Sequence, residues 1–266
     1  MKNIFTLTLL LLISTNLYST KCDHNDDYEV RYISEDMQLN NQIQENLRNQ
    51  FPWQEFTSNN PNWFTYFNEY NYKPHRAFGT PIDLLNGSAV EQKFQNFILS
   101  DLSVFNIPSN LSLTRKTENE KYINLDYTQY YNNLEVIDSR LYAKFNLNHQ
   151  LVAFGLDVFS DISIDIIPTV SETDAINSGS QNITSPVFNT IVEDALKILP
   201  IPLNGKYNYH LVYTVRVSTK LTHGPANYIC YVDANSGELL MRINTVLYEA
   251  PPQANIHVEG EVYTTH

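Results

Sequence analysis

The sequence is short of positive charge and of glycine, and each shortage narrows the function classes. There are 17 Lys and Arg against 29 Asp and Glu, so the net charge is −12 at pH 7. The electric field of this negative charge repels phosphate backbones and anionic lipid, and we therefore expect no nucleic-acid partner. We interpret the acidity as solubility in an extracellular space, with docking on a basic partner as the alternative. Only 8 Gly are present, which leaves little material for loops that cradle phosphate.

Catalytic signatures are missing as well. None of the 7 His is followed by Glu, so the zinc-binding HExxH motif is absent. The sequence also has no G-x-S-x-G elbow, no P-loop, no G-x-G-x-x-G and no CxxC spacing. We therefore predict that the chain is not an enzyme and holds no cofactor of its own.

Long hydrophobic runs are absent except at the N-terminus. Lys2 precedes an apolar run over residues 4–13, and small or polar residues follow around Ser19 and Thr20. This pattern predicts a secretory signal peptide over residues 1–19. The run is shorter than the roughly 20 residues that span a bilayer. We therefore expect a secreted, periplasmic or cell-envelope protein with no transmembrane segment.

Cysteine is limited to Cys22 and Cys230. In an oxidising compartment these two residues can form one disulfide. Two alternatives stay open, because Cys230 can be a small buried hydrophobe and Cys22 can be a lipidated N-terminal residue. Lys21 directly before Cys22 does not fit the small residue that a bacterial lipobox requires.

What the sequence does contain is a strand-rich pattern, with 42% hydrophobic residues, 18 Tyr and 13 Phe. We predict an α+β fold of two consecutive units, each with a helix packed on an antiparallel β-meander. In the first unit, helical periodicity covers residues 39–51 and 89–105, and Pro52 ends the earlier helix. Residues 73–82 are predicted to be an ordered crossover loop, since two prolines and Gly79 interrupt them. Alternation predicts strands over residues 62–70, 111–117, 121–131, 136–147 and 151–159.

The second unit begins near Pro168. A short helix is predicted to start at Ser171 or Thr173, and a longer one from Pro186 through Leu199, because Ser185 and Pro186 form a cap-then-proline start. Strands are expected over residues 207–217, 227–233 and 238–244. The stretch YICYVDANSGELL, residues 228–240, has the alternation and the polar turn of a β-hairpin.

Few residues are candidates for chemistry or binding. His75 and Arg76 form the most prominent charged pair and, with Phe78, are candidates for contact with a partner, although Arg76 can instead anchor its own loop. Asp157, Asp161 and Asp165 are spaced four apart, which suggests either a cation-binding ladder or a solvated face. We favour the solvated face. Sequons for glycosylation occur at Asn86, Asn110 and Asn182.

The order of these parts resembles the pro-region of secreted zinc metallopeptidases of the fungalysin and thermolysin type. Three blocks carry the resemblance: NWFTYFNEYNYKPHRAFGTPI at 62–82, YTQYYNNLEVIDSRLYAKFNLNHQLVAFGLDVF at 127–159, and NYICYVDANSGELLMRIN at 227–244. The first unit resembles the fungalysin/thermolysin propeptide domain, and the unit after it resembles a PepSY domain. The family has Gly in the middle block where this chain has Asn133, a residue that also tolerates left-handed backbone.

The resemblance implies a division of the chain and a function. The expected parts are a signal peptide (1–19), an N-terminal helical and polar lead segment (20–60), a propeptide-like domain (61–165), a PepSY-like domain (168–247), and a linker with the start of a missing downstream domain (248–266). A zinc-binding catalytic domain follows the PepSY unit in the family, so we expect a fragment of a longer precursor, with zinc only in the missing part. The implied function is inhibition and folding assistance of that metallopeptidase.

Two other functions stay open from the sequence. One is a free-standing envelope protein that inhibits a peptidase in trans or binds a peptide by strand addition. The other is the pro-region of an exported protein that is not a peptidase, such as an adhesin. Under each, the chain is a binding module whose partner is a protein.

Overall fold

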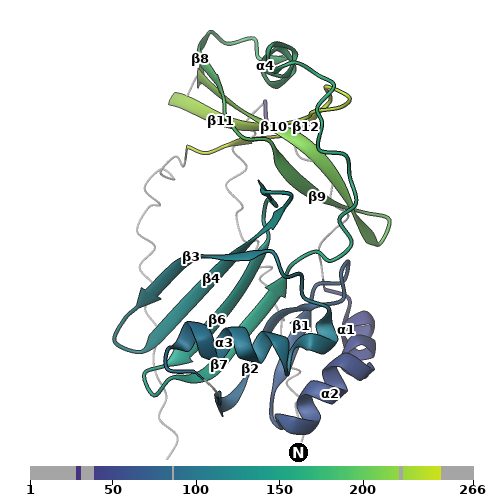
Figure 1. The fold of residues 1–266 in the computed structure, drawn as a ribbon. Coiled ribbons are helices and arrows are strands. Elements are labelled where there is room, and N and C mark those ends of the chain that lie inside the picture. Colours follow the sequence, from purple (N-terminus) through teal and green to yellow (C-terminus); the bar gives the residue numbers. More distant parts are fainter. Residues whose placement is uncertain (1–27, 31–38, 86, 222–223, 247–266) are drawn as a thin grey trace, which may run out of the picture. The chain divides into compact units, whose positions relative to one another are not determined.

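The computed structural model describes residues 28–30, 39–85, 87–221 and 224–246 (Figure 1). The predicted signal peptide, Cys22, Asn86 and the tail 248–266 with His257 and His266 lie outside the described residues. Within them, a few helices and runs of antiparallel strands form an α+β fold, as predicted. No helix in this described part has the length and apolar character needed to cross a bilayer.

The first sheet has the strand order β1-β2-β7-β6-β4-β3, and β5 pairs with β4. Its neighbouring strands are all antiparallel. The bounds are β1 (Phe64–Phe67), β2 (Pro74–Asp83), β3 (Leu111–Glu118), β4 (Tyr122–Tyr131), β5 (Leu134–Glu135), β6 (Arg140–Asn146) and β7 (Gln150–Asp157). The turn from β4 to β5 holds Asn133 at φ 66°, so the expected left-handed backbone at this position is confirmed.

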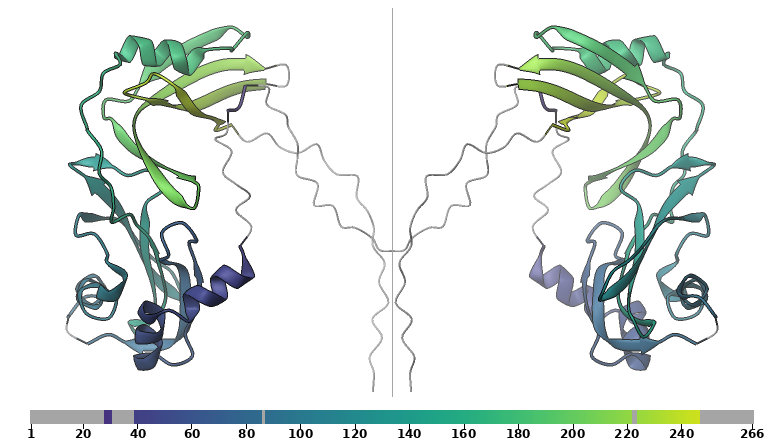
Figure 2. Two further views of the ribbon diagram at one scale, coloured as in Figure 1. Left: turned by 90° about the vertical axis from the view of Figure 1, so that its right-hand side faces the viewer. Right: turned by 90° about the vertical axis from the view of Figure 1, so that its left-hand side faces the viewer.

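Helices cover one face of this sheet. They are α2 (Phe51–Asn59) and α3 (Val90–Leu99), followed by the 3₁₀ turn η1 (Ser103–Phe105), whereas α1 (Asn41–Arg48) lies along the β1 edge. Figure 1 and Figure 2 show α3 lying across the strands. The ring of Phe154 on β7 is fully buried, 5.4 Å from Phe56, 5.5 Å from Trp63 and 6.3 Å from Phe97. The predicted helix over 89–105 therefore exists, but its last turn is a separate 3₁₀ segment.

Helix α1 also protects the outer edge of β1. The side-chain amide of Gln44 accepts from the backbone N–H of Phe67 and donates to its carbonyl, at 2.8 and 3.0 Å. Arg48 donates to the carbonyl of Thr65 at 3.3 Å. These bonds occupy backbone groups that an edge strand otherwise leaves free for aggregation.

The crossover loop predicted over 73–82 is wrong, because this stretch is strand β2, hydrogen-bonded on both sides. Proline lacks an N–H and is tolerated in a strand at its first residue or at an irregularity. Pro74 is the first residue of β2, and Pro81 lies where the β2–β7 register shifts between Phe78 and Ile82. The prolines therefore fall at positions that the sheet accommodates.

The second sheet has the order β12-β11-β10-β8, and β9 pairs with the first part of β10. Its elements are α4 (Glu172–Ser180), β8 (Val187–Val192), β9 (Lys197–Leu203), β10 (Lys206–Leu221), β11 (Gly224–Asp233) and β12 (Leu239–Asn244). Ser171 caps α4 through a bond from the Asp174 N–H, as its place in the sequence predicts. The hairpin predicted over 228–240 is confirmed as β11 and β12.

The helix predicted from Pro186 through Leu199 is wrong, because these residues form β8 and the start of β9. Half of the apolar side chains in this stretch are β-branched, which favours a strand. Val192 pairs with Val215 and Ile198 with Leu211, so the long strand β10 supplies partners for both segments. These long-range pairings override the local cap-and-proline signal.

Candidate functional site: the open face of the first sheet

The face of the first sheet opposite the core carries polar and aromatic side chains in aligned rows, and we call it the open face. Strand pairing aligns Tyr66 with Arg76, Tyr142 with Asp126, and Asp126 with Arg115. A second row has these members, in strand order: Phe64, Phe78, Ala153, Lys144, Asn124 and Thr117. Residues two apart in a strand point to the same face, so both rows lie on one surface.

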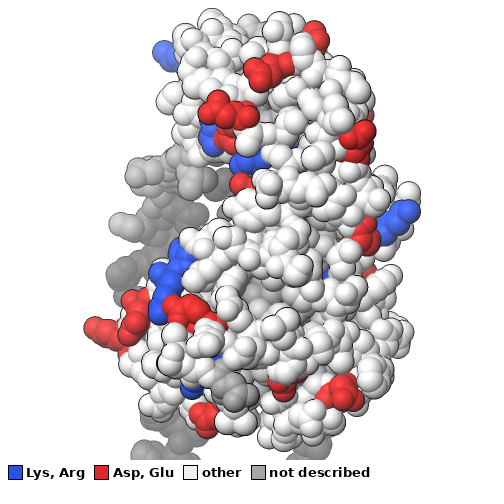
Figure 3. Space-filling view, in the orientation of Figure 1, with Lys and Arg blue, Asp and Glu red and all other residues white. Residues whose placement is uncertain are grey.

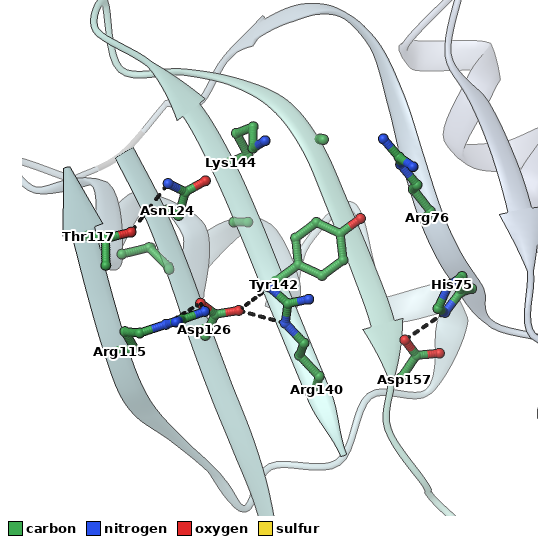
Figure 4. Close-up of a pocket in the computed structure, with 13 residues that line it drawn as sticks. His75, Arg76, Arg115, Thr117, Asn124, Asp126, Arg140, Tyr142, Lys144 and Asp157 are labelled. Carbon is green, nitrogen blue, oxygen red and sulfur yellow. Dashed lines mark hydrogen bonds and ion pairs between the residues drawn. The ribbon is translucent and has the colours of Figure 1, made fainter. Parts of the chain in front are cut away.

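A cavity of about 440 Å³ is hollowed into the open face (Figure 4). Its charged lining has more cations than carboxylates, although the whole chain is strongly acidic. The charged residues are Arg76, Arg115, Arg140, Lys144, Asp126 and Asp157, joined by His75. On the face drawn in Figure 3, by contrast, Asp and Glu are scattered in small groups among mostly uncharged residues.

Asp126 holds two of the cations in place. Its Oδ2 accepts from Nε and Nη2 of Arg115 at 3.1 and 2.9 Å, and its Oδ1 accepts from Nε of Arg140 at 2.6 Å. The Asp126 side chain is only 10% exposed, whereas both arginines are more than half exposed. One carboxylate therefore orients two guanidinium groups, and their outer surfaces still face solvent.

The floor of the cavity depends on Gly155. The ring of Tyr142 lies over this glycine, and a Cβ added there would be 2.8 Å from Cδ1 of Tyr142 and closer still to the His75 carbonyl. The guanidinium of Arg140 stacks 4.7 Å from the centre of the same ring. Burial raises the pKa of Tyr142, against a smaller lowering by Arg76 and Arg140, so its hydroxyl keeps its proton at neutral pH.

His75 and Asp157 form a pair at one end of the cavity, with Nδ1 and Oδ2 2.8 Å apart. The hydrogen bond to Asp157 raises the pKa of His75, and this effect exceeds the opposing effect of burial. The imidazole is 59% exposed, so solvent screens the pair. His75 is therefore oriented by Asp157 and gains a proton more readily than a free histidine.

Arg76 and Lys144 differ from the other cations of the cavity. Among the described residues, neither has a carboxylate within 4.0 Å. Each makes a cation–π contact instead. Arg76 lies 5.9 Å from the centre of the Phe78 ring, and Lys144 lies 4.9 Å from the centre of the Tyr122 ring. Both cations retain their capacity to bind an anion.

Aromatic side chains border the cavity on the side of β1 and β2. Phe64, Tyr66 and Phe78 are each about 40% exposed, and the rings of Tyr66 and Phe78 lie 5.2 and 6.0 Å from that of Phe64. Arg48 of α1 lies over the Phe64 ring at 4.7 Å. Half-exposed aromatic rings grouped beside arginines are typical of surfaces that bind protein.

The structure thus places the three residues singled out from the sequence on one surface. His75 and Arg76 line the cavity, and Phe78 lies at its aromatic border. The alternative role for Arg76, as an anchor of its own loop, has no counterpart, because the segment is a strand. Sequence reasoning missed Tyr142 and Lys144, although their alternation within a predicted strand already placed them on its polar side.

The series Asp157, Asp161 and Asp165 does not form one site, because only Asp157 lines the cavity. Asp157 pairs with His75, Asp161 accepts from the Tyr209 hydroxyl, and Asp165 accepts from the Ile167 N–H. No cluster of three or more metal-type ligands occurs in the described ranges.

Cys230 is fully buried as a free thiol, and its Sγ lies 3.4 Å from the Gly179 carbonyl. Burial raises its pKa to about 11. Its alternative role as a small buried hydrophobe therefore fits its surroundings. Since Cys22 lies outside the described residues, the disulfide stays a prediction.

Comparisons with known proteins give little. No protein-family model matches the sequence, and no curated protein matches it. Among solved structures, the chain is similar to the C-terminal domain of YpeB from Bacillus megaterium, with a TM-score of 0.31 and 10% identity over 81% of this chain and 99% of that one. A TM-score this low assigns neither a family nor a function.

Proposed function

We propose that this chain is an exported, noncatalytic pro-region that binds a zinc metallopeptidase, inhibits it and assists its folding. The order of sequence blocks that resemble the propeptide and PepSY domains supports this proposal. The single observation that carries it is the open face, where exposed aromatic and cationic side chains are aligned in rows on one sheet. Aromatic residues and arginine supply much of the binding energy in protein interfaces.

The mechanism needs no chemistry from this chain. A partner that covers the open face buries Phe64, Tyr66 and Phe78 and removes apolar surface from water. If the peptidase is on the same polypeptide, the tether gives an effective concentration of about millimolar, so a modest interface suffices. If the peptidase is a separate polypeptide, this tether is absent, and the open face must bind the peptidase more tightly to inhibit it. Zinc belongs to the partner in both arrangements.

Inhibition and refolding assays test this function. The purified chain is mixed with thermolysin-type peptidases, and peptide hydrolysis and recovery of activity after denaturation are measured. The variant Phe64→Ser with Phe78→Ser should weaken inhibition at least about tenfold, the loss expected from two interface aromatics. The matched control is Phe188→Ser, which changes an exposed aromatic on β8 in the second sheet. If no peptidase is inhibited or helped to refold, the proposal is wrong.

A second function, peptide capture by strand addition, is favoured by β8. This strand ends the second sheet, and its Phe188 and Ile191 are 67% and 51% exposed. Ile191→Lys should abolish binding under this hypothesis and leave it unchanged under the first. The gene sequence beyond codon 266 distinguishes between the possible precursor proteins. An in-frame HExxH motif favours a metallopeptidase, and repeat modules favour an adhesin.

A further inference from the structure

We propose that Arg76, Lys144 and the hydroxyl of Tyr142 form a binding site for an aspartate or glutamate side chain of the partner protein. The three groups line one cavity, and Figure 4 shows the Tyr142 hydroxyl on the side of the ring that faces Arg76. The inference rests on the proposed function, because it names the chemistry that the same open face selects.

Charge complementarity is the first argument. Arg115 and Arg140 already share the carboxylate of Asp126, and His75 is paired with Asp157. Arg76 and Lys144 are left without a carboxylate within 4.0 Å among the described residues. A carboxylate bound between them would receive charge-assisted hydrogen bonds from both.

The neutral donor is the second argument. The Tyr142 ring is held over Gly155 and under the guanidinium of Arg140, so the position of its hydroxyl is fixed before a ligand arrives. A tyrosine hydroxyl is protonated at neutral pH, and burial raises the pKa of Tyr142 further, so the group donates to an anion rather than repelling it. A donor that is already fixed beside cations reduces the ordering cost of binding a carboxylate.

The surroundings identify a protein segment as the source of the carboxylate. Asp126 and Asp157 line the same cavity, and the chain as a whole has a charge of −12, so a polyanion such as nucleic acid meets repulsion around the site. Phe64 and Phe78 lie beside Arg76 in the second row and offer apolar surface. The ligand that fits both features is an extended segment with an acidic residue next to apolar residues.

A peptide titration tests the site on the full chain. The probe is a capped pentapeptide of alternating Leu and Asp, and the matched peptide has Asn in place of Asp. Binding is followed by NMR shifts of the backbone amides of β2, β6 and β7. We expect the acidic peptide to bind at least about threefold more tightly than the amide peptide at an ionic strength of about 0.01 M, and to weaken as salt is raised to about 0.15 M.

The variants locate the contact. Arg76→Gln, Lys144→Gln and Tyr142→Phe should each weaken binding of the acidic peptide by about three- to tenfold and leave the amide peptide unaffected. Lys206→Gln, at an exposed lysine that begins β10, is the control and should change nothing. Equal binding of the two peptides, equal losses in Lys206→Gln, or tighter binding of a DNA duplex than of the acidic peptide would each overturn the site.

The outcomes separate this inference from the function on which it rests. If Arg76→Gln and Lys144→Gln inhibit a peptidase as well as the unchanged chain does, while Phe64→Ser with Phe78→Ser does not, the acidic-residue site is wrong and the pro-region function stands. If the acidic peptide binds as described but no peptidase is inhibited, the site stands and the function is wrong.

Discussion

Replacing Gly155 by alanine should destabilise the chain through packing at the cavity floor. The backbone at Gly155 does not have the positive φ that excludes side chains, so the cost comes from space alone. The new Cβ would be 2.8 Å from Cδ1 of Tyr142, where ordinary contact begins at 3.4 Å, and closer still to the His75 carbonyl on the neighbouring strand. The Tyr142 ring must move, and β2 must shift away from β7.

The magnitude follows from two opposing effects. Overpacking of this kind costs about 1–3 kcal/mol. Replacing glycine by alanine restricts the unfolded chain and returns about 0.4–1 kcal/mol. The net loss in free energy of unfolding is about 1 kcal/mol at the middle of these ranges and about 2.6 kcal/mol at most, which for a chain near this size lowers Tm by about 2–4 °C per kcal/mol.

Urea denaturation of single and double variants is the assay. Removing the ring with Tyr142→Ala should relieve part of the cost of Gly155→Ala, and the remainder reports the His75 carbonyl. Gly205→Ala is the comparison, because no atom lies within 4 Å of its added methyl and its cost comes from φ +74°. If Gly155→Ala is as stable as the unchanged chain, or if Tyr142→Ala relieves both glycine variants equally, the packing argument is refuted.

Three further predictions concern buried or paired groups. Phe154→Ala removes a fully buried ring that contacts three aromatic neighbours and should cost about 3–5 kcal/mol in urea denaturation; a loss below about 2 kcal/mol would contradict the core packing. NMR titration should give His75 a pKa above its usual value, and Asp157→Asn should lower that pKa. Because the pKa of His75 is higher in the folded than in the unfolded chain, the pair stabilises the folded chain fully below about pH 6.5. This stabilisation is lost as the pH rises through the folded pKa. Burial lowers the pKa of Lys73 to about 8, so Lys73→Met should raise the free energy of unfolding by about 1–3 kcal/mol at neutral pH. This increase should shrink as the pH rises above about 8. A lower free energy of unfolding at neutral pH would mean that the contact of Lys73 with Ser160 outweighs the cost of burying the charge.

The strands that could be predicted from the sequence are those in which apolar and polar residues alternate, because one face of each strand is buried and the other is exposed. In β4 and β6, buried residues such as Leu125 and Leu141 alternate with more exposed ones, and the predicted and observed limits of β4 differ by one residue. The hairpin of β11 and β12 was predictable because Asp233 and the Asn-Ser-Gly turn are local signals, and the Asp233 carboxylate does accept from two N–H groups of that turn.

The errors arose where a local signal competes with a distant partner. The prolines of β2 discourage a strand only if their missing N–H groups face a neighbour, and the register that decides this is set by β1 and β7. The residues after Ser185 have both helical spacing and β-branched side chains, and β10 decides between these two signals by pairing with them. Neither partner can be identified from the segment itself.

The open face shows why the net charge of a chain does not predict the charge of the ligand that one local site binds. A net charge of −12 is a sum over all surfaces, whereas a ligand meets the few groups that strand order brings together. Arg76 and Lys144 are 68 positions apart in the sequence, and they share a cavity because β7 pairs with β2 on one side and β6 on the other. An acidic chain can therefore present a local site for an acidic residue, and the strong overall negative charge restricts that site to isolated carboxylates rather than polyanions.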